Sequence, residues 1–450
     1  MKILNDMRLK IDNPNWAVDP ELALIDTILN QNPKLYEIVA EDINELNQNS
    51  DRGRQDSPTV EQVVRAAIDK EIKKLDYREL EYAQYDSRIW GGFIKLEERT
   101  PFSFEVMHKY ISRIKGESLQ KLMVEINRVM RVEEEVEDGR SLRTDSTVVE
   151  TDIHYPTNNS LIWDCIKTSH RLLKKLEESG KIRKVRNYQK QAKKNVFGIN
   201  NTKKKEKRTE LFEKQLKFLR SSINQVRKVV VVEEVITGAD LTVISVVEEL
   251  KSLLPKMEKV YDMSLRHEIK GEAVPVGEKI FSIYEGHTDL IVKGAREVEF
   301  GHKVNLTTGR SNLILDCEIV DGNPKDSVLY EGVLERVRSD YGIRPRDMVT
   351  DGGYASLRNQ EKAKEYGLVN IVFNKIVGSL KNLVTSVNME TRLKKWRSGM
   401  EAVISNVKRG FNLFRCDWKG REHFDAKVLW SVIAYNIRVM SGFMLGKLMP

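Results

Sequence analysis

The stretch Asp347-Met348-Val349-Thr350-Asp351-Gly352-Gly353-Tyr354 decides how this 450-residue chain is interpreted. Its first four residues are predicted to form a strand, which Asp351 ends directly. The carboxyl ends of strands are where α/β sheets build their sites, and two glycines allow a ligand or metal ion to approach the backbone. Taken alone, an aspartate before two glycines is more often a turn residue, so the rest of the chain has to decide between the two interpretations.

The elements on either side of this strand follow a definite order. Periodicity and turn residues predict a strand at 142–153, helices within 159–263, a hairpin of 303–307 and 312–320, a helix at 326–341, the strand ending at 350, a helix at 357–366, a strand at 369–373 and helices at 391–409 and 427–444. This is the order of an α/β, ribonuclease-H-like fold, a mixed sheet flanked by helices. A large helical insertion interrupts it after the first strand.

Two further carboxylates occupy notable places in that order. Asp145 lies in a polar cluster, residues 143–147, that interrupts the first strand, and buried sheets rarely tolerate such polarity without a reason. Glu401 lies on the predicted helix 391–409. At about 100° per residue, Arg397, Glu401, Lys408 and Lys394 share one charged stripe. An apolar stripe of Trp396, Met400, Val403 and Val407 would face the sheet.

Two aspartates and one glutamate that converge on one spot are hard oxygen ligands suited to Mg²⁺ or Mn²⁺. Two such ions, about 3.5–4 Å apart, can activate an attacking oxygen and stabilise a leaving one in phosphodiester chemistry. Arg397 and Lys408 would then hold DNA phosphates. The alternatives are a surface ion pair for Glu401 and a turn cap for Asp145, but the joint arrangement on one fold favours the metal site.

The charge is very unevenly placed along the chain. Lys and Arg total 75 and Asp and Glu 67, a net charge of +8, yet residues 167–228 alone hold 21 basic and 5 acidic residues. A dense basic segment in an otherwise acidic protein predicts a polyanionic partner, with nucleic acid ahead of an anionic membrane surface. The residues expected to bind DNA here are Lys203, Lys204, Lys205, Lys207 and Arg208. The alternative is a solvated helical arm.

The sequence before the first strand predicts a compact helical domain. Thr59 and Gln62 have the spacing of a capping box, and a helix is expected over 104–130. Lys109 and Arg113 lie on its polar face, where they would contact a major groove or phosphates, or simply face solvent. The predicted domains are a helical arm and linker at 1–58, a helical DNA-binding domain at 59–138, a catalytic domain at 139–158 and 279–450, and a basic helical insertion at 159–278.

These motifs together resemble the signature of bacterial insertion-sequence DDE transposases. The resemblance is carried by Thr144-Asp145-Ser146-Thr147, by Thr350 to Tyr354, by Arg397 through Glu401 to Lys408, by Glu299-Phe300-Gly301-His302-Lys303-Val304 and by Gly322-Asn323-Pro324-Lys325-Asp326. Residues 59–126 are similar to the family's helical N-terminal domain. Two features depart from the family: Lys394 stands where relatives often have Tyr, and the insertion follows the first strand.

The resemblance implies a recombinase that binds the terminal inverted repeats of its own element, cuts them and joins them to target DNA. Asp145, Asp351 and Glu401 would be the triad holding two Mg²⁺ or Mn²⁺ ions, with Arg397 and Lys408 as phosphate contacts. Double-stranded DNA and a second copy of the chain, in a synaptic homodimer, are the expected partners. A catalytically inactive DNA-binding descendant and a nuclease without strand transfer are the alternatives.

Other classes of protein have little support in the sequence. The three cysteines, Cys165, Cys317 and Cys416, are far apart, so neither a disulfide framework nor a cysteine zinc site is expected. There is no P-loop or dinucleotide fingerprint, and the scattered histidines lack ligand spacing. No segment is expected to be apolar enough to span a bilayer. A cytoplasmic, nucleoid-associated protein is therefore expected.

Overall fold

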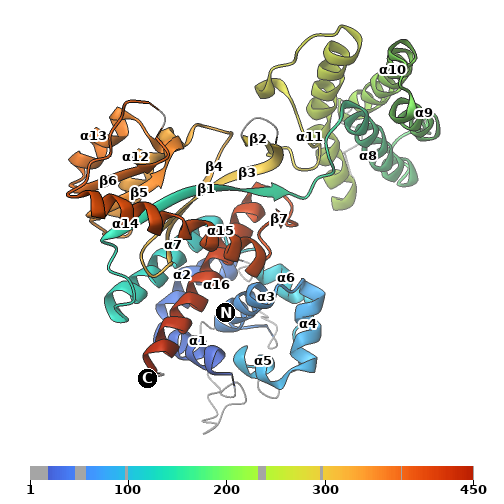
Figure 1. The fold of residues 1–450 in the computed structure, drawn as a ribbon. Helices are drawn as coiled ribbons and strands as arrows, with labels where there is room; N and C mark the ends of the chain where they lie inside the picture. Colours follow the sequence, from blue (N-terminus) through green and yellow to red (C-terminus); the bar gives the residue numbers. More distant parts are fainter. Residues whose placement is uncertain are drawn as a thin grey trace. The chain divides into compact units, whose positions relative to one another are not determined.

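The computed structural model describes residues 19–45, 57–96, 100–231, 240–293, 297–376 and 378–448. The chain forms two compact units, drawn in Figure 1. The first, called the sheet unit, comprises residues 1–151 and 291–450, and the second, called the helical unit, comprises residues 152–290. Each unit has its own apolar core.

The sheet unit is built on one mixed sheet. Its strands are β1 (Ser141–Thr151), β2 (Asp289–Lys293), β3 (Glu297–Thr308), β4 (Ile314–Val320), β5 (Asp347–Asp351), β6 (Asn370–Asn374) and β7 (Arg415–Cys416). The order is β2-β3-β1-β5-β6, with β4 paired to β3 and β7 to β1. β1 is antiparallel to β3 and parallel to β5, and β3 and β4 form the predicted hairpin. The sheet confirms the ribonuclease-H-like fold expected from the sequence.

Helices cover both faces of this sheet. They are α12 (Asp326–Ser339), α13 (Leu357–Glu365), α14 (Val387–Arg397), α15 (Gly399–Gly410) and α16 (Arg421–Leu448). α12 and α13 lie on one face, and α14 and α15 on the other (Figure 1). The single helix predicted over 391–409 is wrong, because the chain forms two helices that meet at Ser398.

α16 corrects the expectation about apolar segments. By length and composition it could cross a membrane, but 67% of its most apolar stretch is buried inside the protein. Its buried side chains, among them Phe424, Trp430 and Ile433, belong to the core of the sheet unit. The apolar character of α16 therefore follows from packing on all sides, as expected for a core helix.

The N-terminal part of the sheet unit is helical, as predicted. Its helices are α1 (Pro20–Gln31), α2 (Lys34–Asn44), α3 (Val60–Lys73), α4 (Tyr77–Asp86), α5 (Arg88–Phe93), α6 (Phe104–Ile111), α7 (Gly116–Arg128) and the π-helix η3 (Val129–Glu133). The capping box is confirmed, since the Thr59 N–H donates to Gln62 Oε1 over 2.9 Å and the Gln62 N–H to Thr59 Oγ1 over 3.2 Å. Most of the predicted linker at 47–58 lies outside the described residues.

The continuous helix predicted over 104–130 is wrong for a tertiary reason. α6 ends at Ile111, and α7 begins only after Lys115, whose backbone is extended. The Lys115 N–H donates to Asp42 Oδ2 of α2 over 2.9 Å. A contact with α2, more than 70 residues earlier in the chain, thus sets the break. The spacing of apolar residues along the chain cannot predict such a contact.

A buried carboxyl on α3 predicts an unusual pH dependence of stability. Asp69 is fully buried, neither of its oxygens has a hydrogen-bond partner among the described residues, and burial raises its pKa from 3.8 to about 8. The folded protein therefore keeps a proton that the unfolded chain has released between about pH 4 and 8, so stability falls as the pH rises through this window.

We expect Asp69→Asn to remove this loss. The variant should match the wild-type protein near pH 4 and exceed its unfolding free energy by about 2 kcal/mol or more at pH 9. Thermal unfolding followed by calorimetry across this pH range measures the difference. Parallel stability curves for the two proteins would contradict the assignment.

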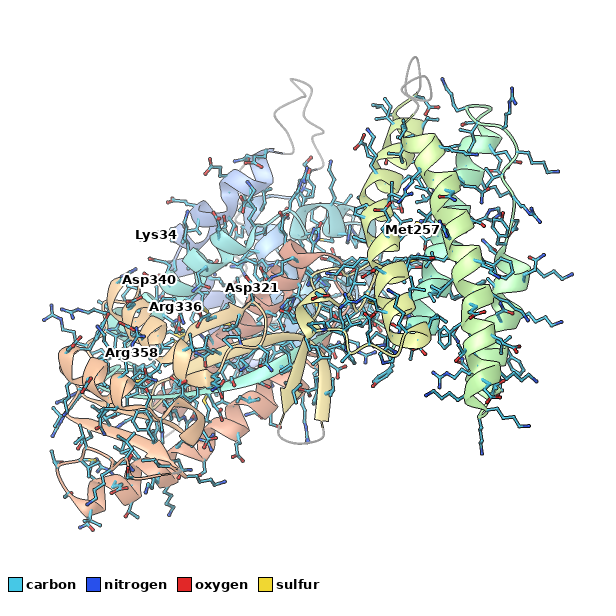
Figure 2. The ribbon with its side chains drawn as sticks, turned by 90° about the horizontal axis from the view of Figure 1, so that it is seen from above. Lys34, Met257, Asp321, Arg336, Asp340 and Arg358 are labelled. Carbon is cyan, nitrogen blue, oxygen red and sulfur yellow. The ribbon has the colours of Figure 1, made fainter. Side chains whose placement is uncertain are left out.

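The helical unit is a bundle made of the insertion. It contains α8 (Asn158–Glu178), α9 (Gln189–Asn201), α10 (Lys205–Val230) and α11 (Leu241–Ser264), followed by the π-helix η5 (Leu265–Ile269) and the 3₁₀-helix η6 (Val276–Glu278). α8, α10 and α11 pack against one another and α9 packs on α8 and α10. Met257 of α11 lies in their core (Figure 2). The predicted helical insertion after the first strand is confirmed.

Candidate active site

Two of the predicted carboxylates lie on neighbouring parallel strands. β1 and β5 pair in a register that places Thr144 opposite Thr350, so the residues that follow, Asp145 and Asp351, lie side by side. Asp351 is the last residue of β5, and its side chain is 42% exposed. The Asp145 side chain is only 18% exposed. The strand pairing therefore brings together one buried and one accessible carboxylate.

Arg397 connects these two acids to the third. Its Nη2 lies 2.6 Å from Asp145 Oδ2 and 3.8 Å from Asp351 Oδ1, and its Nη1 lies 3.6 Å from Glu401 Oε1. The Arg397 side chain is 8% exposed, whereas that of Glu401 is 74% exposed. Three acids that are distant in the sequence thus surround one buried guanidinium group.

The surroundings of the largely buried Asp145 shift its protonation. Burial raises the pKa of the Asp145 carboxyl to about 6, while the Arg397 guanidinium and the Ser146 N–H act to lower it. The carboxylates of Asp351 and Asp326 raise it further. A carboxylate in this position gains from a nearby positive charge, because such a charge stabilises its ionised form.

Arg397 also determines how the acids are arranged. Across the part of the chain that the structure describes, no three acidic, histidine or cysteine side chains are grouped as a metal centre. Arg397 lies among the three carboxylates instead. The donors are nevertheless carboxylate oxygens, the ligands preferred by Mg²⁺ and Mn²⁺, and the spot already stabilises one cation. In their chemistry, though not in their present arrangement around Arg397, these donors match those of a divalent-ion site.

Arg143 fixes the helices that carry Arg397 and Glu401, and the sequence analysis overlooked it. Its Nε donates to Thr308 Oγ1 over 2.9 Å and its Nη1 to the carbonyl oxygen of Trp396 over 2.6 Å. The guanidinium carbon lies 4.9 Å from the centre of the Trp396 ring. Arg143 therefore ties the end of α14, one residue before Arg397, to the strand that carries Asp145.

The first residue of α15 makes room for this guanidinium group. A Cβ atom on Gly399 would lie 2.5 Å from Nη1 of Arg143. We expect Gly399→Ala to displace the joint between α14 and α15. In the metal-dependent DNA cleavage that the sequence predicts, the variant should be about 10²-fold slower, because small misplacements of reacting groups are costly. DNA affinity should not change. Cleavage assays with titrated DNA measure both quantities.

Gly410→Ala is the matched control for this prediction. Gly410 ends the same helix, and a Cβ atom there would have no neighbour within 4 Å. It should therefore cleave DNA like the wild-type protein. Equal activity of the two variants would show that the contact between Arg143 and Gly399 does not position the site.

Asp326 is a fourth carboxylate beside the site. It begins α12, and its Oδ1 accepts from Lys303 Nζ over 3.0 Å and from Ser146 Oγ over 3.2 Å. Ser146 and Asp145 point to opposite faces of β1, as neighbouring strand residues do. The sequence analysis placed Asp326 only in a turn motif. This motif ends at the start of a helix, where an acidic residue often serves only as a cap. The neighbouring sequence therefore gave no sign that Asp326 lies beside the site.

Gly352, directly after Asp351, has a packing role that the sequence does not predict. A Cβ atom on Gly352 would lie 2.5 Å from the carbonyl oxygen of Lys375 and 2.8 Å from that of Asn374. The turn after β5 therefore packs directly on the end of β6. This contact by itself requires glycine at position 352, whether or not a ligand approaches Asp351.

The other predicted DNA contacts are placed as follows. Lys394 pairs with Glu390 of its own helix over 2.7 Å. Lys408 is half-buried, and its Nζ lies 5.4 Å from the centre of the Phe414 ring. Lys109 is exposed on α6, and Arg113 is exposed in the connection after it. Lys203, Lys204, Lys205, Lys207 and Arg208 are all exposed in the helical unit.

Comparison with known protein families gives a match over part of the chain. Residues 291–437 match the family described as Transposase DDE domain. The matched range contains Asp351, Arg397 and Glu401, and it begins after the strand that carries Asp145. No curated protein and no solved structure matches the chain.

Proposed function

We propose that this chain, whose residues 291–437 match the transposase DDE domain, is a DDE transposase of the insertion-sequence type that binds the terminal inverted repeats of its element and catalyses metal-dependent cleavage and strand transfer. The observation that carries the proposal is the convergence of Asp145, Asp351 and Glu401 on the guanidinium group of Arg397, all within 4 Å. A surface ion pair would not explain why residues from a strand, a second strand and a helix joint meet at one buried cation.

In this proposal Asp145, Asp351 and Glu401 hold Mg²⁺ or Mn²⁺, in all two ions. When bound, the ions activate the attacking oxygen and stabilise the leaving oxygen of the phosphodiester. Asp145 is fixed by its place inside the sheet, whereas the exposed Glu401 is free to adjust. Arg397, whose guanidinium group lies beside all three acids, would offer its planar fork of N–H donors to a phosphate of the cut end.

The remaining predicted cations would hold the DNA outside the site. Lys408 and Lys394 lie on the helices that carry Arg397 and Glu401, and Lys109 and Arg113 lie in the N-terminal helices. Double-stranded DNA from the element ends and the target would be the substrates. Synapsis of two ends calls for a homodimer, and such a protein would act in the cytoplasm, on the nucleoid.

Joining of ends to target DNA tests this function directly. The full chain is incubated with Mg²⁺, a DNA fragment carrying its own coding frame with both flanks, and a supercoiled target plasmid. Sequencing should find both fragment ends joined to the plasmid. Cleaved but never joined ends would favour a nuclease, and binding without cleavage in Mg²⁺ or Mn²⁺ would favour an inactive descendant.

A further inference from the structure

α9 displays a basic face with one exposed aromatic side chain in it. The α9 face is defined here as Lys190, Lys193, Lys194 and Phe197. At about 100° per residue these four side chains fall within an arc of about 100°, and Ala192 and Ile199 lie on the opposite side of the helix, where they are buried in the core. Phe197 is 73% exposed. The helix is therefore amphipathic, with an outward face that combines charge and a single large apolar group.

The helix is held firmly in the bundle. Asn159 of α8 donates to the carbonyl oxygen of Val196 over 3.1 Å and to Asn200 Oδ1 over 2.9 Å. A Cβ atom on Gly198 would lie only 3.1 Å from Leu211 of α10, so α9 approaches α10 closely. These contacts leave the α9 face facing outward on a preformed element, which lowers the entropy lost on binding.

The positive charge around this face is not neutralised by the protein. Residues 181–209 contain twelve basic residues and a single acidic one, Glu206. Some cations elsewhere in the helical unit are paired, such as Arg171 with Glu249 over 3.0 Å. Within the described residues, no ion pair joins a lysine of the α9 face to a carboxylate. Figure 2 shows nitrogen-tipped side chains extending outward from this unit.

We propose that the α9 face lies in the major groove of duplex DNA, with its three lysines on phosphates and Phe197 against base edges. The inference rests on the proposed function and names the element of the helical unit that reads the DNA. α9 is about 20 Å long, and the major groove admits an α-helix. Phe197 would contact the methyl groups of thymines, an apolar feature found only in that groove.

A membrane surface fits this face less well. A helix that lies in a bilayer interface needs a broad apolar face, whereas the α9 face has one phenylalanine among lysines. The major groove of DNA has phosphates along both edges and thymine methyl groups on its floor, so it matches a face with lysines around one phenylalanine. The unpaired lysines would release counterions from DNA, so their contribution should appear as salt dependence.

Binding measurements on the full chain separate the two kinds of contact. The probes are 40-base-pair duplexes taken from each flank of the coding frame, measured by fluorescence anisotropy at several salt concentrations. Lys190→Gln, Lys193→Gln and Lys194→Gln together should lower the salt slope by about 2–3. Phe197→Ala should weaken binding about five- to tenfold with an unchanged slope. A variant with Lys251→Gln and Lys259→Gln on α11 is the control and should bind like the wild-type protein.

The opposite results would overturn the inference. An unchanged slope in the triple variant would show that the lysines do not meet phosphates, and full affinity of Phe197→Ala would remove the base contact. Loss of binding to phosphatidylserine vesicles, with DNA binding intact, would assign the face to membranes. Failure of the proposed function can be told apart from failure of this inference. A chain that never cleaves or joins DNA would still show the binding changes if the α9 face contacts DNA. Thermal unfolding of each variant should equal that of the wild-type protein.

Discussion

Asp351→Asn is expected to lower the rate of metal-dependent DNA cleavage by about 10³-fold or more, with DNA affinity within a factor of two of the wild-type value. The amide keeps the shape of the side chain but removes the negative charge that would bind a divalent ion, and such ions supply several kcal/mol of transition-state stabilisation. Asp351 ends β5 with its side chain 42% exposed, so the fold does not depend on its charge. Single-turnover cleavage of end DNA, with binding measured separately, tests both halves.

Asp340→Asn is the matched control, because Asp340 is an exposed aspartate at the end of α12, in the same unit. It should cleave DNA at the wild-type rate. Cleavage by Asp351→Asn at more than a tenth of the wild-type rate would remove Asp351 from the metal site.

Arg397→Gln should affect two measurements in opposite directions. Without DNA, the variant should bind Mn²⁺ about tenfold more tightly, because the guanidinium group no longer competes for the carboxylates of Asp145, Asp351 and Glu401. With DNA, cleavage should fall about 10²-fold or more, because the phosphate loses its bidentate contact. Electron paramagnetic resonance of free Mn²⁺ gives the affinity, and a cleavage assay gives the rate.

Two further variants show which property of Arg397 causes these changes. Arg415→Gln removes an arginine that pairs with Glu150 over 2.8 Å at another place in the same unit, and it should change neither quantity. Arg397→Lys keeps the positive charge but not the planar fork, so its Mn²⁺ affinity should stay near the wild-type value while cleavage remains impaired. Mn²⁺ binding that is unchanged or weaker in Arg397→Gln would contradict the competition.

Much of the catalytic fold could be predicted because its signals are local. The β3–β4 hairpin, the strand that ends at Asp351 and the capping box of Thr59 each depend on residues within a few positions of one another. The helical arithmetic also placed Arg397 and Glu401 on one side of the chain, since the bend at Ser398 is small enough to leave them adjacent. The order of strands and helices along the chain was enough to predict the ribonuclease-H-like fold, whereas the order of the strands within the sheet was not predicted.

The contacts that shape the site could not be predicted in this way. The break between α14 and α15 contains no proline, and the structure shows it beside the Arg143 guanidinium, which comes from β1 and binds the Trp396 carbonyl oxygen. From the sequence, Arg397 was expected to hold a phosphate, with a surface ion pair to Glu401 as the alternative, but its contacts with Asp145 and Asp351 were not predicted. Such partners are distant in the sequence, and residue spacing along one element carries no information about them.

Anomalous diffraction at the manganese edge, from crystals of the protein with Mn²⁺, tests the shared metal site most directly. We predict anomalous peaks within ligand distance of the Asp145, Asp351 and Glu401 carboxylates, with the Arg397 guanidinium group moved away from Asp145. Manganese bound elsewhere, or a Glu401 side chain directed away from the two aspartates while they hold the ion, would contradict the assignment.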